Sequence, residues 1–447
     1  MTASVGMRTY LWCPLLLLAY FSGTGQTVRD ARSSLGEHLR ARALREESPR
    51  HDRDDWDHGV NLALSVRARV ELVRGGMAPA GSADEKALID RAWTAAQQAL
   101  EYEAASLRAR GTSGLDATVR GWGTRKPLSL GGISVPRAID AYSTGTALGA
   151  LADLAWLLDE RHDRRGRDLT AKLEPIAAHW LGARRFAAPG GPAFDKIALP
   201  HPEVRQHVVH NTDALFGRAL LSLSHAARLE GDATRAARYR ELARAIANQI
   251  RQNLLERVLR DDRVSISDWT YELVRRGDAF QPHRPEDSNH ASYLLDFLAA
   301  AATDHLDGDA SWLSARTIAD LGATLSPVIV RRRDGSAAFE LFVNPAEVRD
   351  DARGKKRAAG FVFAADEAHP ERVASWWREL AGSTRTLDLG LSIRTSWGWT
   401  RAVRDRPDLL SLIGQSLLAS DRPDLPLNLF LAQAVFWRES GGLAQER

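Results

Sequence analysis

Cysteine and lysine are scarce in this chain of 447 residues. Cys13 is the single cysteine, so an intramolecular disulfide and a cysteine-rich zinc site are both excluded. Only six of the 60 Lys and Arg residues are lysine, and the formal net charge is +3. Arginine can bind planar carboxylates or phosphates bidentately, but an arginine-rich composition by itself identifies no ligand.

Several common catalytic and nucleotide-binding motifs are absent as well. The chain contains no glycine-rich phosphate loop, no GxSxG turn, no dinucleotide fingerprint and no HExxH motif. Its basic residues are not gathered into one stripe, which disfavours a nucleic-acid partner. What the chain does have is a hydrophobic content of 44%, enough to build a large core.

Residues 1–26 have the order of a secretory signal peptide. Arg8 precedes an apolar run over residues 11–21, and small residues follow at 22–25. The run is too short for a transmembrane helix, and no later stretch is apolar enough to cross a bilayer. Because Cys13 lies inside the run rather than after it, a lipoprotein anchor is not indicated. We expect this segment to be removed and the protein to be periplasmic or secreted.

The remaining sequence indicates helical hairpins. Residues 27–52 are charged and predict a linker or a peripheral helix. Over residues 53–447 one pattern recurs, an apolar helix, a polar turn and a more amphipathic helix. About six such pairs can close into a ring, so we predict one all-α domain, an (α/α)6-type toroid with small β-hairpin insertions. The expected helices cover 55–74, 83–109, 139–161, 167–183, 207–229, 232–258, 287–306, 309–323, 370–382, 392–404, 407–419 and 426–440.

The first helix of each pair should lie inside the ring, because it is apolar over more of its circumference. Residues 142–158 and 213–223 show this pattern clearly. Two segments, 261–271 and 328–364, instead contain runs that are typical of strands. We expect these strands to lie at the rim of the toroid.

Polar residues gather where the predicted inner helices begin. The clusters are D-D-W-D-H at 54–58, D-A-Y-S-T at 140–144, H-V-V-H-N-T-D at 207–213 and E-D-S-N-H-A-S-Y at 286–293. Asp, Ser, Thr and Asn at helix starts are ordinary caps. In a closed ring, however, these starts would converge at one end and form a polar funnel lined by helix N-termini.

One cluster exceeds what capping requires. Glu286, His290 and Tyr293 occupy positions i, i+4 and i+7, so one helical face would carry all three. Together with D-W-T-Y at 268–271 and H-N-T-D-A-L-F-G at 210–217, this cluster resembles secreted (α/α) toroid enzymes that act on polysaccharides. These enzymes include polysaccharide lyases, uronyl C5-epimerases and six-hairpin glycosidases. The chain lacks both the carboxylate spacing of a particular glycosidase family and the ordered Asn-Arg-His-Tyr set of one lyase family.

The residue types favour a lyase or an epimerase acting on a uronic-acid-containing polysaccharide. Both reactions need a base at the carbon next to a carboxylate and a group that neutralises the carboxylate. We expect His290 or Tyr293 to be the base, with His210 and Asn211 holding the carboxylate. The full set of candidate catalytic residues is His290, Tyr293, His210, Asp213, Asp268 and Glu286, and the candidate substrate-binding residues are Asn211, Asn289, Trp269, Tyr271 and Tyr142.

Three alternatives remain open. A six-hairpin glycosidase would use two carboxylic acids, with Asp213, Asp268, Glu286 and Asp287 as candidates. A divalent metal could bind His207, His210 and Asp213, although no cofactor is expected. Finally, residues 219–246 resemble one tetratricopeptide-like helix pair, which would favour a non-enzymatic scaffold, but the helices do not recur at a fixed period.

Overall fold

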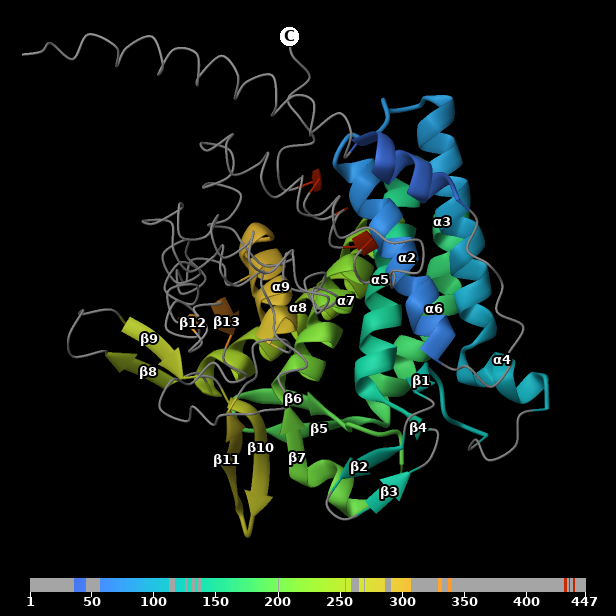
Figure 1. The fold of residues 1–447 in the computed structure, drawn as a ribbon. Helices are drawn as coiled ribbons and strands as arrows, with labels where there is room; N and C mark the ends of the chain where they lie inside the picture. Colours follow the sequence, from blue (N-terminus) through green and yellow to red (C-terminus); the bar gives the residue numbers. More distant parts are fainter. Residues whose placement is uncertain are drawn as a thin grey trace, which may run out of the picture.

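Helical hairpins make up most of the described chain, with short strands at one end (Figure 1). The computed structural model describes residues 36–45, 57–111, 117–124, 127–130, 133–135, 138–199, 201–253, 255–258, 265–268, 270–285, 291–306, 329–331, 337–339, 430–431, 434 and 437–438. The predicted signal peptide and the helices expected between 309 and 419 lie outside these residues.

The helices of the structure follow the predicted pairs. They are α2 (Asp57–Arg74), α3 (Ala83–Glu101), α4 (Ala104–Ala109), α5 (Ala141–Glu160), α6 (Arg165–Gly182), α7 (His210–Leu229), α8 (Ala233–Asn253) and α9 (Ala291–Thr303), with a 3₁₀ turn at Pro202–Gln206. Residue 430 and its described neighbours up to 438 are also helical. None of the helices in the described part of the chain is long and apolar enough to span a bilayer.

Three predicted helix boundaries are wrong. The helix expected over 83–109 is two helices, because Glu103 caps α4 through the Ala105 N–H and also accepts a hydrogen bond from the Gly121 N–H. Residues 207–209 form a strand instead of the first turn of α7, since the β-branched Val208 and Val209 suit strand pairing. Residues 255–258 likewise form a strand and not the end of α8.

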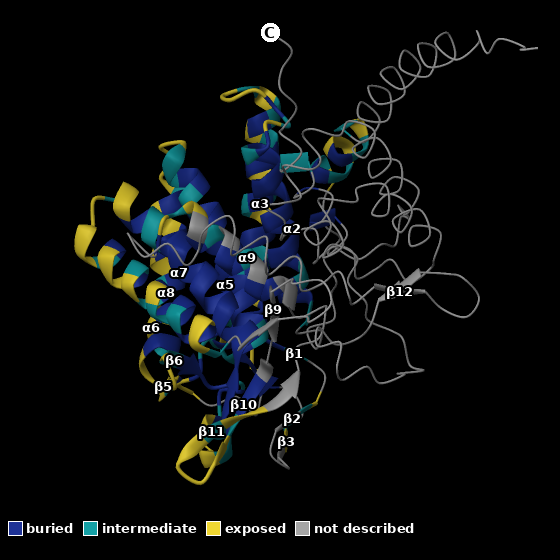
Figure 2. Ribbon diagram, turned by 90° about the vertical axis from the view of Figure 1, so that its left-hand side faces the viewer, coloured by how far each residue is buried: buried dark blue, intermediate teal, exposed yellow. Residues whose placement is uncertain are grey.

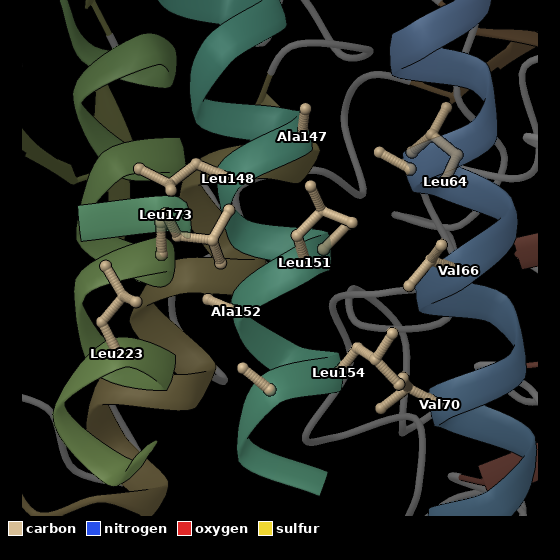
Figure 3. Packing of buried hydrophobic residues seen from close by; sticks show 14 of the residues in the cluster. Leu64, Val66, Val70, Ala147, Leu148, Leu151, Ala152, Leu154, Leu173 and Leu223 are labelled. Carbon is tan, nitrogen blue, oxygen red and sulfur yellow. The ribbon is translucent and has the colours of Figure 1, made fainter. Parts of the chain in front are cut away.

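The predicted inner and outer helices are confirmed. Helices α2, α5 and α7 lie side by side and are buried on nearly all sides, whereas α3, α6 and α8 pack behind them with one face exposed (Figure 2). Helix α9 continues the inner row beside α7. In Figure 3, Leu151 and Leu154 of α5 point toward Val66 and Val70 of α2. The fold class, an all-α toroid of helical hairpins with small β insertions, is therefore the one expected.

The strands form small antiparallel sheets. Near the starts of α5 and α7, Figure 1 shows most of them gathered beneath the helices. The three-stranded sheet has the order β11-β10-β7, and all the other sheets among the described residues are pairs. The strands are β1 (Gly123–Thr124), β2 (Leu128–Leu130), β3 (Ile133–Val135), β4 (Ala138–Ile139), β5 (Arg185–Ala188), β6 (Gly191–Phe194), β7 (His207–Val209), β8 (Leu255–Val258), β9 (Ser265–Asp268), β10 (Thr270–Arg276), β11 (Ala279–Pro285), β12 (Ile329–Arg331) and β13 (Ala337–Phe339).

A buried ionic network joins the inner helices to one another. Asp153 of α5 is 1% exposed and accepts hydrogen bonds from Arg218 and Ser222 of α7. Arg67 of α2 lies 3.5 Å from Asp153 and donates to Asp296 of α9 at 2.9 Å. Burial alone would raise the pKa of Asp153, but the neighbouring arginines outweigh it and lower the pKa to about 2. This carboxylate therefore stays ionised inside the protein.

The two ends of the described chain meet against α2. Residues 36–44 form a helix in which Leu39 and Ala43 are fully buried, and the Ala43 carbonyl accepts a hydrogen bond from Arg69. From the C-terminal side, Arg438 forms an ion pair with Glu71 of α2. These contacts place the last described residues beside the first inner helix, as a closed ring requires.

Glycines allow the inner helices to approach closely, and this gives a testable prediction. A Cβ atom at Gly217 of α7 would lie 2.5 Å from the ring of Phe297 on α9, whereas at Gly149 the nearest atom would be 3.7 Å away. We expect Gly217→Ala to lower the free energy of unfolding by about 1–3 kcal/mol, because a packed core cannot move aside. The matched variant Gly149→Ala should be neutral or stabilising. Urea denaturation compares the two, and equal effects would contradict the close crossing.

Candidate active site

The candidate site lies at the end of the toroid where the inner helices begin. Helix α2 starts at Asp57, α5 follows Asp140, and α7 starts at His210. Strand β10 pairs with β7 directly before α7, with Glu272 opposite Val209. Residues 207–209 form β7 and not the expected first helical turn, and β7 leads directly into α7. Because β10 pairs with β7, the strand that begins at Thr270 lies at the start of α7.

Two tyrosines connect α5 to α9 at this end. The hydroxyls of Tyr142 and Tyr293 lie 2.6 Å apart, and the two rings meet edge to face with centroids 5.4 Å apart. Tyr293 is buried, whereas Tyr142 is partly exposed. Two of the residues selected from the sequence therefore touch, although they are 151 positions apart in the chain.

Asp140 has an unusual carboxyl group at this end. Its side chain is 3% exposed and caps α5 by accepting hydrogen bonds from the N–H and the hydroxyl of Ser143, both at 2.8 Å. Burial raises the pKa of Asp140 to about 7, and the negative charge of Asp57 on α2 adds to the effect. Asp57 has no cationic partner among the described residues. The pair thus combines one carboxyl that is partly protonated near neutral pH with a second, less buried carboxylate.

His210 and Asp213 are buried between α7 and α8 and do not line the surface. Burial lowers the pKa of His210 to about 4, although the Gln249 side chain beside it acts in the opposite direction, so the ring is neutral at physiological pH. Burial also raises the pKa of Asp213 well above its usual value. Asp213 accepts hydrogen bonds from the Phe194 N–H at 3.1 Å and from Gln249 at 3.3 Å. Capping does not explain this cluster, because the N-cap of α7 is Val209 and makes no side-chain cap.

Asn211 lies in the first turn of α7 and is 1% exposed, and its carboxamide oxygen lacks a hydrogen-bond partner. Unpaired buried acceptors are costly, so this oxygen is suited to a donor such as a hydroxyl group. Next to it in the fold, His207 of β7 forms a buried pair with Glu272 of β10 at 2.7 Å. Glu272 was not selected from the sequence, because only the β7–β10 pairing brings it to this end.

The remaining sequence candidates divide into two groups. Asp268 ends β9 and Tyr271 lies in β10, on the two sides of position 269. Glu286, Asn289, His290 and Trp269 fall outside the described residues. Asp140 belongs to one of the polar clusters found in the sequence, where its position indicates an ordinary helix cap. The sequence does not reveal that burial raises the pKa of its carboxyl group.

Trp122, although it lies near this end of the fold, is a core residue. It is fully buried, and its indole N–H donates to the Ala99 carbonyl at 2.8 Å. Both observations show that the ring packs between helices and not against a ligand. With respect to metals, the described residues contain no group of three His, Cys, Asp or Glu side chains that could hold an ion.

Comparisons with known proteins give no family for the chain. No protein-family model and no curated protein matches it. Among solved structures, it is similar to a family 76 glycoside hydrolase from a bovine Bacteroides thetaiotaomicron strain, with a TM-score of 0.49 and 10% identity over 93% of this chain and 78% of the other. It is also similar to a beta-1,3-1,4-glucanase from Paenibacillus sp. X4, with a TM-score of 0.43 and 10% identity over 94% of this chain and 93% of the other. At this distance neither likeness transfers a function, which has to come from the residues of this chain.

Proposed function

We propose that this protein is a carbohydrate-active enzyme that hydrolyses glycosidic bonds in a polysaccharide at the end of the toroid where the inner helices begin. The observation that carries the proposal is the pair formed by Asp140 and Asp57. Burial holds the pKa of Asp140 near 7, so this carboxyl can be protonated near neutral pH, and the charge of the nearby Asp57 adds to the effect. Glycosidases need this combination, one acid to protonate the leaving oxygen and one carboxylate to act as base or nucleophile.

Both acidic residues stand at the starts of inner helices. Asp57 opens α2 and Asp140 caps α5, and these two helices pack against each other along the inner row. Rigid helix ends can hold reacting groups more precisely than loops can. Asp213 is buried as well, but its carboxyl bonds to the Phe194 N–H and to Gln249 and has no second acidic side chain among its main influences. Asp140 does have one, Asp57, and is therefore the stronger acid candidate among the described residues. This assignment replaces the preference for a lyase or an epimerase with the hydrolase alternative.

A lyase or an epimerase is the second candidate, and the tyrosine pair favours it. When Tyr142 and Tyr293 share a hydrogen bond, the accepting hydroxyl can be prepared to act as a base. His210, the residue expected to bind the uronate carboxylate, argues against a lyase or an epimerase. Its pKa is about 4, so the ring is neutral and offers no positive charge to a uronate. Substrate assays therefore have to separate the two reactions.

The test is incubation of the purified protein with a panel of neutral and uronic-acid polysaccharides. We expect new reducing ends without absorbance at about 235 nm, since hydrolysis creates no double bond. Absorbance at that wavelength would instead show elimination and make the tyrosine pair the better candidate. Release of no product from any polysaccharide would contradict both reactions and favour the helical scaffold.

We further propose that the enzyme acts outside the cytoplasm, in the periplasm or the medium. The support is the order of charged, apolar and small residues over 1–26. N-terminal sequencing of the exported protein should show a start between about residues 23 and 27, just after the predicted cleavage. A mature protein that retains Met1 would contradict the export signal.

A further inference from the structure

Ser143 makes two contacts with Asp140, and helix capping requires only one of them. The Ser143 N–H donates to Oδ1 of Asp140, which is the usual N-cap bond. The Ser143 hydroxyl also reaches Oδ2 at the same distance, 2.8 Å. The N-cap of α3 lacks this second contact, because there Ser82 caps with its single hydroxyl oxygen. Ser143 therefore contacts both oxygens of the Asp140 carboxyl, and the Tyr142 backbone N–H adds a weaker contact with the same group.

We propose that Ser143 is a positioning residue that decides which oxygen of Asp140 carries the transferable proton. This inference rests on the proposed role of Asp140 as the acid. Oδ1 faces a backbone N–H, which can only donate, so a proton on that oxygen would be repelled. Oδ2 faces a hydroxyl, which can rotate and either donate or accept. The proton therefore resides on Oδ2.

The hydroxyl also assists the transfer. When Asp140 gives the Oδ2 proton to the glycosidic oxygen, the C–O bond breaks and its electron pair stays on the leaving oxygen. The anomeric carbon bonds to water or to the second carboxylate, and Asp140 is left as a carboxylate. The Ser143 hydroxyl then turns to donate to Oδ2 and stabilises the new negative charge. The negative charge of Asp57 disfavours this new charge and raises the pKa of Asp140. Among the described residues, Asp57 is the one charged group with a main effect on that pKa. Burial and Asp57 raise the pKa of Asp140, and the Ser143 hydrogen bonds lower it. Because of Ser143, Asp140 can therefore release its proton during the reaction.

The test measures the Asp140 carboxyl directly, by NMR titration of the protein labelled with ¹³C-aspartate, with the Asp140→Asn variant as the assignment control. We expect Ser143→Ala to raise the pKa of Asp140 by about 1 unit, because a hydrogen bond to the charged form is lost. Ser143→Thr should restore the original titration, since it retains a hydroxyl. Ser222→Ala removes a serine contact with Asp153 in the ionic network and should leave the Asp140 titration unchanged.

The outcomes separate this inference from the proposed function. If Ser143→Ala left the pKa of Asp140 unchanged and lowered only the melting temperature, Ser143 would be part of the cap and the inference would be wrong. If the pKa shifted but Asp140→Asn retained full activity, the contact would be real and the proposed acid wrong. Where a substrate has been found, the alkaline limb of the kcat/KM profile should move in the same direction as the NMR value.

Discussion

Asp140→Asn should lower turnover by ~10²–10⁴, the range expected when a general acid is lost. Asparagine caps a helix about as well as aspartate, so α5 should form normally while the side chain has no proton to give. In the unmodified protein, activity should fall as the pH rises through about 7, because Asp140 then loses its proton. The measurement is kcat/KM against pH for both proteins on a polysaccharide that the panel identifies.

Stability provides the control for this variant. The pKa of Asp140 in the folded protein, about 7, lies above the ordinary value of 3.8, so the carboxyl contributes stability below pH 3.8 and loses it as the pH rises to about 7. Asp140→Asn should therefore unfold no sooner than the unmodified protein at pH 8. Ser82→Ala, which removes the cap of the outer helix α3, should reduce stability and leave activity intact. If Asp140→Asn retained activity, Asp140 would not be the catalytic acid, and Glu286 would become the next candidate.

Asp153→Ala should be the most destabilising single substitution in the described ionic network. It would leave Arg67, Arg218 and Arg74 without the carboxylate they share, all within 4.0 Å of it in the structure. Removing one member of a buried ionic group costs about 3–5 kcal/mol, because the remaining charges stay buried without compensation. Chemical denaturation at pH 7 gives the free energy of unfolding directly.

The control for this variant is Asp90→Ala, which breaks the exposed pair with Arg165 and should cost less than about 1 kcal/mol. The pH dependence provides a second check. Because the pKa of Asp153 is about 2 in the folded protein and lies below its ordinary value of 3.8, its stabilising effect is present above pH 3.8 and is lost as the pH falls toward 2. A loss for Asp153→Ala as small as that for Asp90→Ala would show that the network is not tightly buried.

The hairpin architecture could be predicted from the sequence, because hydrophobic periodicity depends only on which faces of a helix must avoid water. The apolar stretches at 142–158 and 213–223 lie in α5 and α7, which the structure places in the inner row. The polar residues at the helix starts could also be predicted from the sequence, because helix capping depends only on neighbouring residues. Local rules fail where strands compete, and so residues 207–209 pair with β10 instead of extending α7.

The properties of the site, by contrast, depend on contacts between segments far apart in the chain. Nothing local distinguishes Asp140 from an ordinary cap, and only its burial and the nearby Asp57 of another helix raise its pKa. The same physics acts in the opposite direction on His210, whose burial lowers its pKa and leaves the ring neutral. The sequence by itself determines which chemical groups stand at the helix starts. Tertiary structure decides which of them are protonated, because desolvation and neighbouring charges arise only when the helices pack together.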